Sequence, residues 1–171
     1  ALVNNIRSGV AVYRAVDKGR NFVFVEFNKA AEKIEGVDRY DVIGKTVTAC
    51  FPGVKDFGLF EVLGRVFKTG SPEHFPLALY KDERIIGWRD NYVYKLPTGE
   101  IVAVYDDITD RIIEKEEKDR LVNILEGTPD IVGVADVHGK TVYLNKAGLS
   151  WLGYQSIDEV VGRDLKAFHA P

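Results

Sequence analysis

The chain has 171 residues, of which 46% are hydrophobic and 29% charged, an ordinary composition that excludes a disordered protein. The formal net charge of -3, without any lysine- or arginine-rich block, excludes nucleic acid as the expected partner, and no apolar stretch reaches the roughly 20 residues that a membrane helix needs. The single cysteine, Cys50, excludes an internal disulfide and favours a reducing, cytoplasmic location, so we expect no direct contact with a membrane.

Two strands are predicted at the beginning of the chain, over residues 9–16 and 21–27, because both stretches are rich in β-branched and aromatic residues. The turn residues between them indicate a hairpin. Asn28 follows as the N-cap of a short helix that ends at Gly36. Residues 38–43 predict another helical turn, so a group of short helices is expected after the hairpin.

A longer amphipathic helix is predicted over residues 56–69, where apolar side chains recur at helical spacing. Three strands are predicted after it, over residues 74–80, 85–96 and 101–107. Pro76 lies inside the first of them and predicts an edge position or a bulge, because proline lacks the N–H that an inner strand needs. The order of two strands, several helices and three strands predicts an α+β fold, in which helices cover one face of a five-stranded antiparallel sheet.

A helix of another kind is predicted over residues 110–127. Its middle is almost wholly charged, while apolar residues gather at both ends. We expect a connector helix that is exposed to solvent. Pairing with the same helix of a second copy is the alternative, although the apolar residues do not form sustained heptads.

The end of the chain repeats the pattern of its beginning at an offset of 117 or 118 residues. Residues 27–36 return as residues 144–153, with the asparagine, the lysine–alanine pair and the final glycine in the same order. Residues 42–45, Val-Ile-Gly-Lys, return as residues 160–163, Val-Val-Gly-Arg. A repeat of this length indicates small domains in series. Residues 128–171 lack the long helix and the last three strands, so we expect them to be half of a second domain.

Half of a domain cannot bury its apolar faces by itself. We therefore expect residues 128–171 to pack against the first domain or to be completed by another chain through strand exchange, with disorder as the remaining alternative. A freely exposed, isolated hairpin would contradict this expectation.

These motifs, in this order, resemble the PAS domain family with its C-terminal PAC strands. The motifs are Phe27-Asn28, the helix that ends at Gly36, the Val-Ile-Gly-Lys of residues 42–45, and the closing Asp107, Ile108, Thr109, Asp110 and Arg111. The closing motif, followed by a charged helix and another hairpin, is typical of PAS arrays in bacterial and archaeal sensor proteins. The resemblance implies a PAS domain over residues 1–110, a connector helix over 110–127 and the first half of a second PAS domain over 128–171.

The resemblance also implies a function, that of a non-enzymatic sensory or relay module in a signal-transduction protein. Such a module is expected to form a homodimer, to hold a small ligand in its core, and to transmit a change through its exit helix. The expected output is a histidine kinase of a two-component system, or a cyclic-dinucleotide enzyme, in the same polypeptide. The closing motif gives the candidate relay residues, which are Asp107, Ile108, Thr109 and Arg111. The alternatives are a ligand-free module for dimerisation and protein interaction, and a small enzyme on a similar scaffold.

Catalytic residues and metal sites are not expected. No metal-ligand spacing is present among the three histidines, which are His74, His138 and His169. Flavin-binding light sensors of the family place a reactive cysteine where this chain has Val47, and Cys50 lies outside that motif. Haem-binding members use a histidine on the long helix, which has none here. The resemblance therefore disfavours flavin and haem, and the cofactor is unknown.

The strand over residues 85–96 is the candidate for a small-molecule site. Its alternation places Trp88, Asp90, Tyr92 and Tyr94 on one face and Arg89, Asn91 and Val93 on the other. Aromatic rings beside one or two polar groups are typical of ligand sites. The alternative is that the rings pack under the helices or form a dimer surface, while Arg89 and Asp90 pair at the protein surface. The candidate ligand-binding residues are Arg65, His74, Trp88, Arg89, Asn91, Tyr92 and Tyr94.

Overall fold

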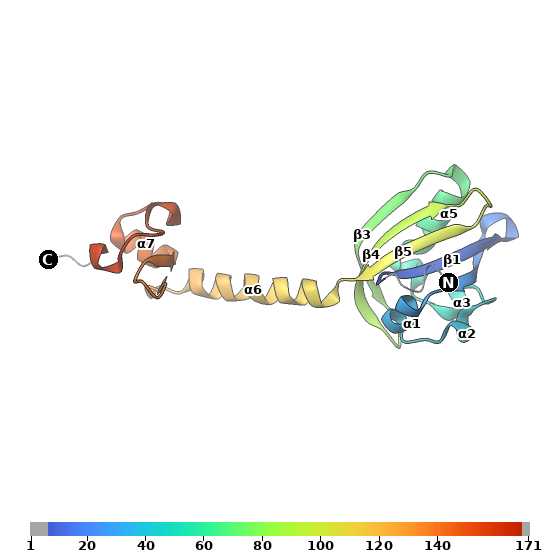
Figure 1. Cartoon of the computed structure of the whole chain (residues 1–171), viewed down its shortest axis with the longest axis horizontal. Helices are drawn as coiled ribbons and strands as arrows, with labels where there is room; N and C mark the ends of the chain where they lie inside the picture. The colour runs from blue at the N-terminus through green and yellow to red at the C-terminus, as the bar shows by residue number, and fades with distance from the viewer. Residues whose placement is uncertain (1–6, 169–171) are drawn as a thin grey trace. The chain divides into compact units, whose positions relative to one another are not determined.

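A computed structural model describes residues 7–168 of the chain (Figure 1). The chain divides into two compact units, Ala1–Ile112 and Ile113–Pro171. His169, one of the three histidines of the sequence, lies outside the described residues.

Within residues 7–112 the strands form a five-stranded antiparallel sheet in the order β2-β1-β5-β4-β3. The strands are β1 (Gly9–Val16), β2 (Asn21–Phe27), β3 (Glu73–Lys81), β4 (Ile86–Lys95) and β5 (Ile101–Asp107). β1 pairs with β5, which joins the first hairpin to the later three strands (Figure 1). The predicted strands are therefore confirmed to within one residue at each end, and so is the α+β fold.

Helices cover one face of this sheet (Figure 1). They are α1 (Lys29–Glu35), α2 (Arg39–Val42), α3 (Val47–Cys50), α4 (Val54–Phe57) and α5 (Leu59–Thr69). Asn28 caps α1 as predicted, because its Oδ1 accepts the backbone N–H of Ala31 at 2.8 Å. Gly36 ends α1 with a φ of 62°, a left-handed conformation that glycine adopts without strain.

The single helix predicted over residues 56–69 is wrong, because two helices, α4 and α5, meet inside this stretch. They are separated by Gly58, whose φ of 91° cannot occur within a helix. The apolar spacing continues across the break, so periodicity alone did not reveal it. The predicted apolar face is nevertheless correct: its buried residues are Leu59, Val62, Leu63 and Val66.

β3 is an edge strand and also carries a bulge, as Pro76 predicts. It pairs with β4 on one side, and its register shifts between Phe75 and Ala78. Leu77 adopts a φ of 51° in the shifted segment. The missing N–H of the proline therefore falls where the ladder is already interrupted.

The core between the sheet and the helices is filled mainly by aromatic rings. Phe22, Phe24 and Phe27 of β2 are almost completely buried. The Phe24 ring lies 4.9 Å from the Tyr13 ring and 5.7 Å from the Phe51 ring, measured between centroids. Tilted and edge-on rings at such distances attract one another beyond the effect of burial alone. These rings leave little space between the sheet and the helices.

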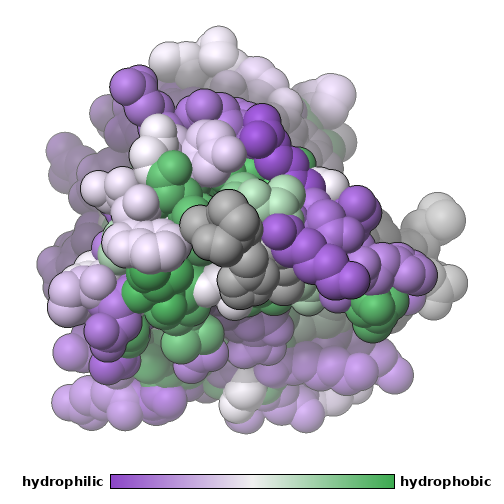
Figure 2. All heavy atoms as spheres, turned by 90° about the vertical axis from the view of Figure 1, so that its left-hand side faces the viewer, coloured by the Kyte–Doolittle hydropathy of each residue, from purple (hydrophilic) through white to green (hydrophobic). Residues whose placement is uncertain are grey.

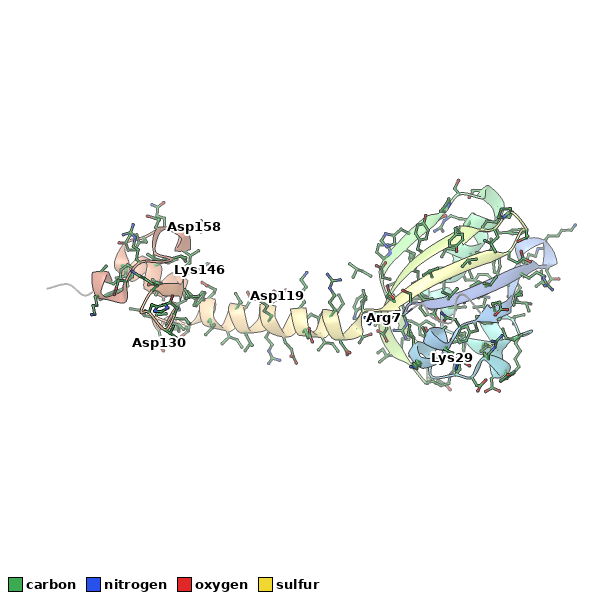
Figure 3. All side chains as sticks on the ribbon, in the orientation of Figure 1. Arg7, Lys29, Asp119, Asp130, Lys146 and Asp158 are labelled. Atoms are coloured by element: carbon green, nitrogen blue, oxygen red, sulfur yellow. The ribbon has the colours of Figure 1, made fainter. Side chains whose placement is uncertain are left out.

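The connector helix is α6 (Thr109–Gly127), and none of its residues, all of which the structure describes, is buried. Side chains project from all sides of it, with Asp119 near the middle (Figure 3). Its exposed large apolar residues are Ile113, Leu121, Val122 and Ile124. Within residues 7–168 no helix is both long enough and apolar enough to cross a membrane.

The described part of the second unit contains a two-stranded sheet, formed by β6 (Gly133–Ala135) and β7 (Thr141–Leu144), and one α-helix beyond α6, α7 (Lys146–Leu152). Two 3₁₀ turns follow, Ile157–Glu159 and Leu165–Phe168. The hairpin is not isolated, since the backbone N–H of Thr141 donates to the Arg163 carbonyl at 2.8 Å.

Apolar side chains remain at the surface of this second unit. Trp151 is 73% exposed, Val142 54% and Ile131 51%. Figure 2 shows hydrophobic side chains among hydrophilic ones on this face. The local fold of residues 128–168 therefore forms, but it leaves part of its apolar surface uncovered.

The two copies of the repeated pattern form the same hydrogen bonds. Asn28 Oδ1 accepts from the backbone N–H groups of Val10 and Ala31. Asn145 Oδ1 accepts from those of Val132 and Gly148. Each asparagine therefore ties a helix start to the beginning of the hairpin before it, and Lys29 and Lys146 begin the two helices (Figure 3).

Candidate functional site

The most unusual side chain of the core is an arginine. Arg89 lies on the inner face of β4 and is only 2% exposed. Its Nε donates to Glu35 Oε1 at 3.2 Å, and its Nη1 lies 3.1 Å from Asp107 Oδ2. Its Nη2 also reaches the carbonyl oxygen of Ile34 at 3.4 Å. A buried guanidinium requires such partners, because removal of its hydration is otherwise costly.

Three separate elements supply this cluster of charges, which we call the polar cluster: Glu35, Arg89 and Asp107. Glu35 is the last residue of α1 and Asp107 the last of β5. Gly87 lies two residues before Arg89 on the same face of β4, where a side chain would collide with the Arg89 guanidinium and the Thr109 hydroxyl. The absence of a side chain at Gly87 therefore makes room for the arginine.

Burial changes the acid–base properties of the groups around Arg89. Burial raises the pKa of the Glu35 carboxyl, although the Arg89 charge and hydrogen bonds from Arg89 and Tyr105 oppose this change. Burial, together with the charge of Glu35, also raises the pKa of the Tyr13 and Tyr105 hydroxyls. Both tyrosines therefore keep their protons in the neutral range and can donate hydrogen bonds into the core.

A small cavity of about 40 Å³ lies beside the polar cluster. Its lining is aromatic and apolar on most sides, and its polar members are Tyr13, Glu35, Tyr80, Arg89, Asn91 and Tyr105. Small-molecule sites usually measure about 300–1,000 Å³. The side chains as packed here therefore do not fit a flavin ring or a haem. Cys50 does not line the cavity, and burial raises the pKa of its thiol.

Asn91, also on the inner face of β4, is 2% exposed. Its side-chain Nδ2 finds no hydrogen-bond partner among the residues that the structure describes. Buried donors are nearly always paired, so this amide stands out among the polar atoms that line the cavity.

Asp107 connects the polar cluster to the beginning of α6. Its Oδ1 accepts the backbone N–H of Thr109 at 3.0 Å and also the Thr109 hydroxyl proton. The Thr109 Oγ1 in turn accepts the backbone N–H of Trp88 at 2.9 Å, and the Ile108 N–H donates to the Trp88 carbonyl at 3.0 Å. The first turn of α6 is thus bonded both to the polar cluster and to β4. Arg111, the remaining candidate relay residue, is exposed.

The structure places the seven candidate ligand-binding residues in different surroundings. Arg89 and Asn91 line the cavity. Trp88, Tyr92 and Tyr94 lie on the outer face of β4, away from the cavity. Arg65 and His74 are exposed.

These two exposed residues have partners at the surface. Arg65 Nη2 lies 2.8 Å from Glu73 Oε2, and His74 Nε2 lies 2.6 Å from Asp90 Oδ1. The alternative interpretation of this strand placed both Asp90 and Arg89 in pairs at the surface. Asp90 does pair there, but Arg89 is buried. Sequence reasoning missed Glu35, because nothing in its neighbourhood distinguishes it from the other charged residues of a short helix.

No three His, Cys, Asp or Glu side chains within residues 7–168 come close enough together to hold a metal ion. Of the ionisable groups that line the cavity, Glu35 and Arg89 are paired with each other.

A family model described as PAS domain matches residues 16–110 and 129–171. These residues make up more than half of the chain, so the chain belongs to the PAS domain family. A search of curated protein sequences found no match.

The solved structures that resemble this chain include domains of sensor proteins. A domain of a sensory box sensor histidine kinase/response regulator from Geobacter sulfurreducens is 16% identical, with a TM-score of 0.49 over 62% of this chain and 88% of that one. A LOV domain from a blue-light activated histidine kinase of Erythrobacter litoralis is 16% identical, with a TM-score of 0.50 over 61% and 99%. An RNA-binding Light-Oxygen-Voltage receptor is 13% identical, with a TM-score of 0.50 over 72% and 35%. At such identities the likeness concerns the fold alone.

Proposed function

We propose that the chain is a non-enzymatic sensory and relay part of a signal-transduction protein. In this proposal the PAS domain of residues 1–110 senses a change in its core, and α6 transmits that change to an output domain such as a histidine kinase. Residues 128–171 are then the first half of a second PAS domain in series. Membership of the PAS family and the sensor kinases among the related folds support this role.

One observation carries the relay proposal: an unbroken series of polar contacts leads from the cavity to the first turn of α6. It runs from Glu35 through Arg89 to Asp107, and from Asp107 to Thr109. A change in the charge or position of Glu35 alters the forces on Arg89, and therefore on the carboxylate that caps α6. Binding at the cavity shifts the helix only if the bound molecule has different affinities for two arrangements of this series.

Hydrogen exchange in a double-mutant cycle tests the relay. We expect Glu35→Gln to change the exchange rate of the Ile112 amide, which donates to the Ile108 carbonyl in the first turn of α6. In a Thr109→Val background the same substitution should have no such effect, because the contact between Asp107 and the helix is weakened. Asp106→Asn is the matched control, since Asp106 is exposed and points to the opposite face of β5. Equal effects of Glu35→Gln in both backgrounds would contradict the relay.

A homodimer is the second part of the proposal, and the outer face of the sheet supports it. Tyr92 and Leu79 are exposed there, and the Tyr92 and Tyr94 rings lie 6.0 Å apart. Opposite Tyr92 in the register, β5 contributes the half-buried Val104 to the same face. An aromatic and aliphatic face of this kind favours burial against a second copy.

Sedimentation equilibrium tests the dimer. We expect Tyr92→Lys to weaken self-association by at least tenfold, because a charge would be buried at the centre of the interface. Tyr40→Lys is the control, because Tyr40 is 85% exposed and lies on α2, away from the sheet. A wild-type chain that stays monomeric at millimolar concentration would contradict the proposed homodimer.

The ligand-free interaction module remains the second candidate function. The small volume of the cavity favours it, because the aromatic side chains already fill most of the core. An enzyme is disfavoured, because the carboxylates of the polar cluster are held by Arg89 rather than presented to an open site.

A further inference from the structure

We propose that the cavity beside Asn91 takes a small, neutral molecule that accepts a hydrogen bond through a carbonyl-type oxygen. The inference rests on the proposed sensory function and gives the chemical class of what is sensed. It begins from the unpaired Nδ2 of Asn91, which is the unsatisfied donor among the described residues of the cavity lining. A donor that is buried without a partner is the natural attachment point for an acceptor.

The charged groups that line the cavity, Arg89 and Glu35, are already engaged. The Arg89 guanidinium contacts Glu35, Asp107 and the Ile34 carbonyl. The Glu35 carboxyl is bonded to Arg89. A bound molecule therefore finds its hydrogen bonds at Asn91, and next at the buried Tyr13 hydroxyl, and not by displacing the internal ion pairs.

The charge of the site excludes an anionic ligand. The polar cluster holds two carboxyl groups, Glu35 and Asp107, against the single guanidinium of Arg89. Of these groups Glu35 and Arg89 line the cavity, and because both carboxyl groups hold the guanidinium, Arg89 has no positive charge left to compensate an anion. A buried anion without positive charge to compensate it is strongly disfavoured. A cation would place another positive group beside the Asn91 amide protons.

The volume limits the size of the ligand. A cavity of about 40 Å³ holds a few water molecules, since one water needs roughly 10–15 Å³ by this measure. The walls are flat rings, among them Phe24, Phe27 and Phe51. A planar molecule of about four non-hydrogen atoms therefore fits, with its apolar part against the rings and its oxygen at Asn91.

Three probes of equal size but different charge test the proposal: acetone, acetate and trimethylammonium. We expect acetone, titrated to tens of millimolar, to produce saturable NMR shifts of the Asn91 side-chain amide and of the Phe24 ring. Acetate and trimethylammonium should bind at least tenfold more weakly. Preference for either charged probe would overturn the proposal, as would a lasting water contact at the Asn91 amide that acetone does not displace.

A pair of variants checks the role of the amide. Asn91→Leu keeps the number and branching of the side-chain heavy atoms and removes the donor, so we expect acetone to bind at least tenfold more weakly. Tyr92→Phe, on the outer face of the same strand and away from the cavity, should leave acetone binding unchanged and serves as the folded control. Undiminished binding to Asn91→Leu would overturn the assignment.

The hydrogen-exchange experiment at Ile112 uses no probe molecule, so its result does not depend on whether acetone binds. Conversely, a relay that fails while acetone binds would contradict the proposed function and leave the ligand class in place. The two ideas are therefore separable by measurement.

Discussion

Arg89 and Glu35 form an ion pair across 54 positions of the chain, with Nε and Oε1 3.2 Å apart and both side chains buried. This pair joins the inner face of β4 to the end of α1. It is a contact that only the folded sheet creates, and it determines both the charge beside the cavity and the position of Asp107.

Removal of the arginine should therefore be far more damaging than removal of an exposed one. We expect Arg89→Met to lower the free energy of unfolding by about 3–5 kcal/mol, because Glu35 is left buried without its partner. Arg65→Met is the matched control, since Arg65 pairs with Glu73 at the surface and should cost less than about 1 kcal/mol. Urea denaturation of both variants measures the difference, and equal losses would contradict the role given to burial.

The raised pKa of Glu35 predicts how stability depends on pH. Because burial raises this pKa above its ordinary value of 4.5, the folded chain holds the proton more tightly than the unfolded chain. The resulting stability is fully present below pH 4.5 and is lost as the pH rises through the folded-state value. We expect the unfolding free energy of the wild type, relative to Glu35→Gln, to fall over this window. Denaturation curves at half-unit steps of pH check this, and a difference that rises with pH would show that Arg89 outweighs burial.

In the second unit, stability should depend on pH in the opposite direction. The hydrogen bond from the Tyr143 hydroxyl lowers the pKa of Glu126 and raises that of Tyr143 to about 12. The stability that this bond contributes is present above the ordinary pKa of Glu126 and is lost as the pH falls through the lowered value. The protection factor of the Lys146 amide against hydrogen exchange should therefore fall in acid, because this amide donates to Glu126 Oε2. In Tyr143→Phe we expect a smaller fall in this protection factor.

The two matching asparagines should behave alike, each in its own unit. Asn28→Ala removes a helix cap and leaves the Val10 N–H buried without its acceptor, so we expect a loss of about 2–4 kcal/mol. Asp38→Ala, which removes the exposed cap of α2, should cost about 1 kcal/mol or less. Asn145→Ala should increase hydrogen exchange of the Val132 and Gly148 amides. If exchange of these two amides is unchanged in Asn145→Ala, the two asparagines share a sequence pattern but not a structural role.

Two glycines of the helical region should respond in opposite directions to alanine. Gly58→Ala forces a side chain into a left-handed conformation beside the Phe75 ring, so we expect a loss of about 1–2 kcal/mol. Gly64 lies inside α5, and no described atom lies within 4 Å of a methyl group placed there. Gly64→Ala should therefore stabilise the chain by about 0.5–1 kcal/mol. Thermal unfolding of both variants measures the contrast, and the same sign for both would contradict the helix break at Gly58.

Sequence reasoning located the strands and caps because each is determined by a few neighbouring residues. The alternation of β4 separated Arg89 and Asn91 from Trp88 and Tyr92, and this separation is correct. It did not reveal which face was inside, because both faces carry polar and large side chains. It also missed the break at Gly58, because the apolar spacing continues across it.

The sequence by itself determined the order of the elements, the repeat and the family, since hydrophobic period, capping residues and turn glycines act over short distances along the chain. Only the tertiary structure decided that Arg89 points inward, that Glu35 and Asp107 meet it there, and that Asn91 is left with an unpaired donor. Pairing of β1 with β5 and packing of α1 against the sheet bring these distant groups together. No local pattern encodes such a meeting, because it depends on which face of the closed sheet the helices cover.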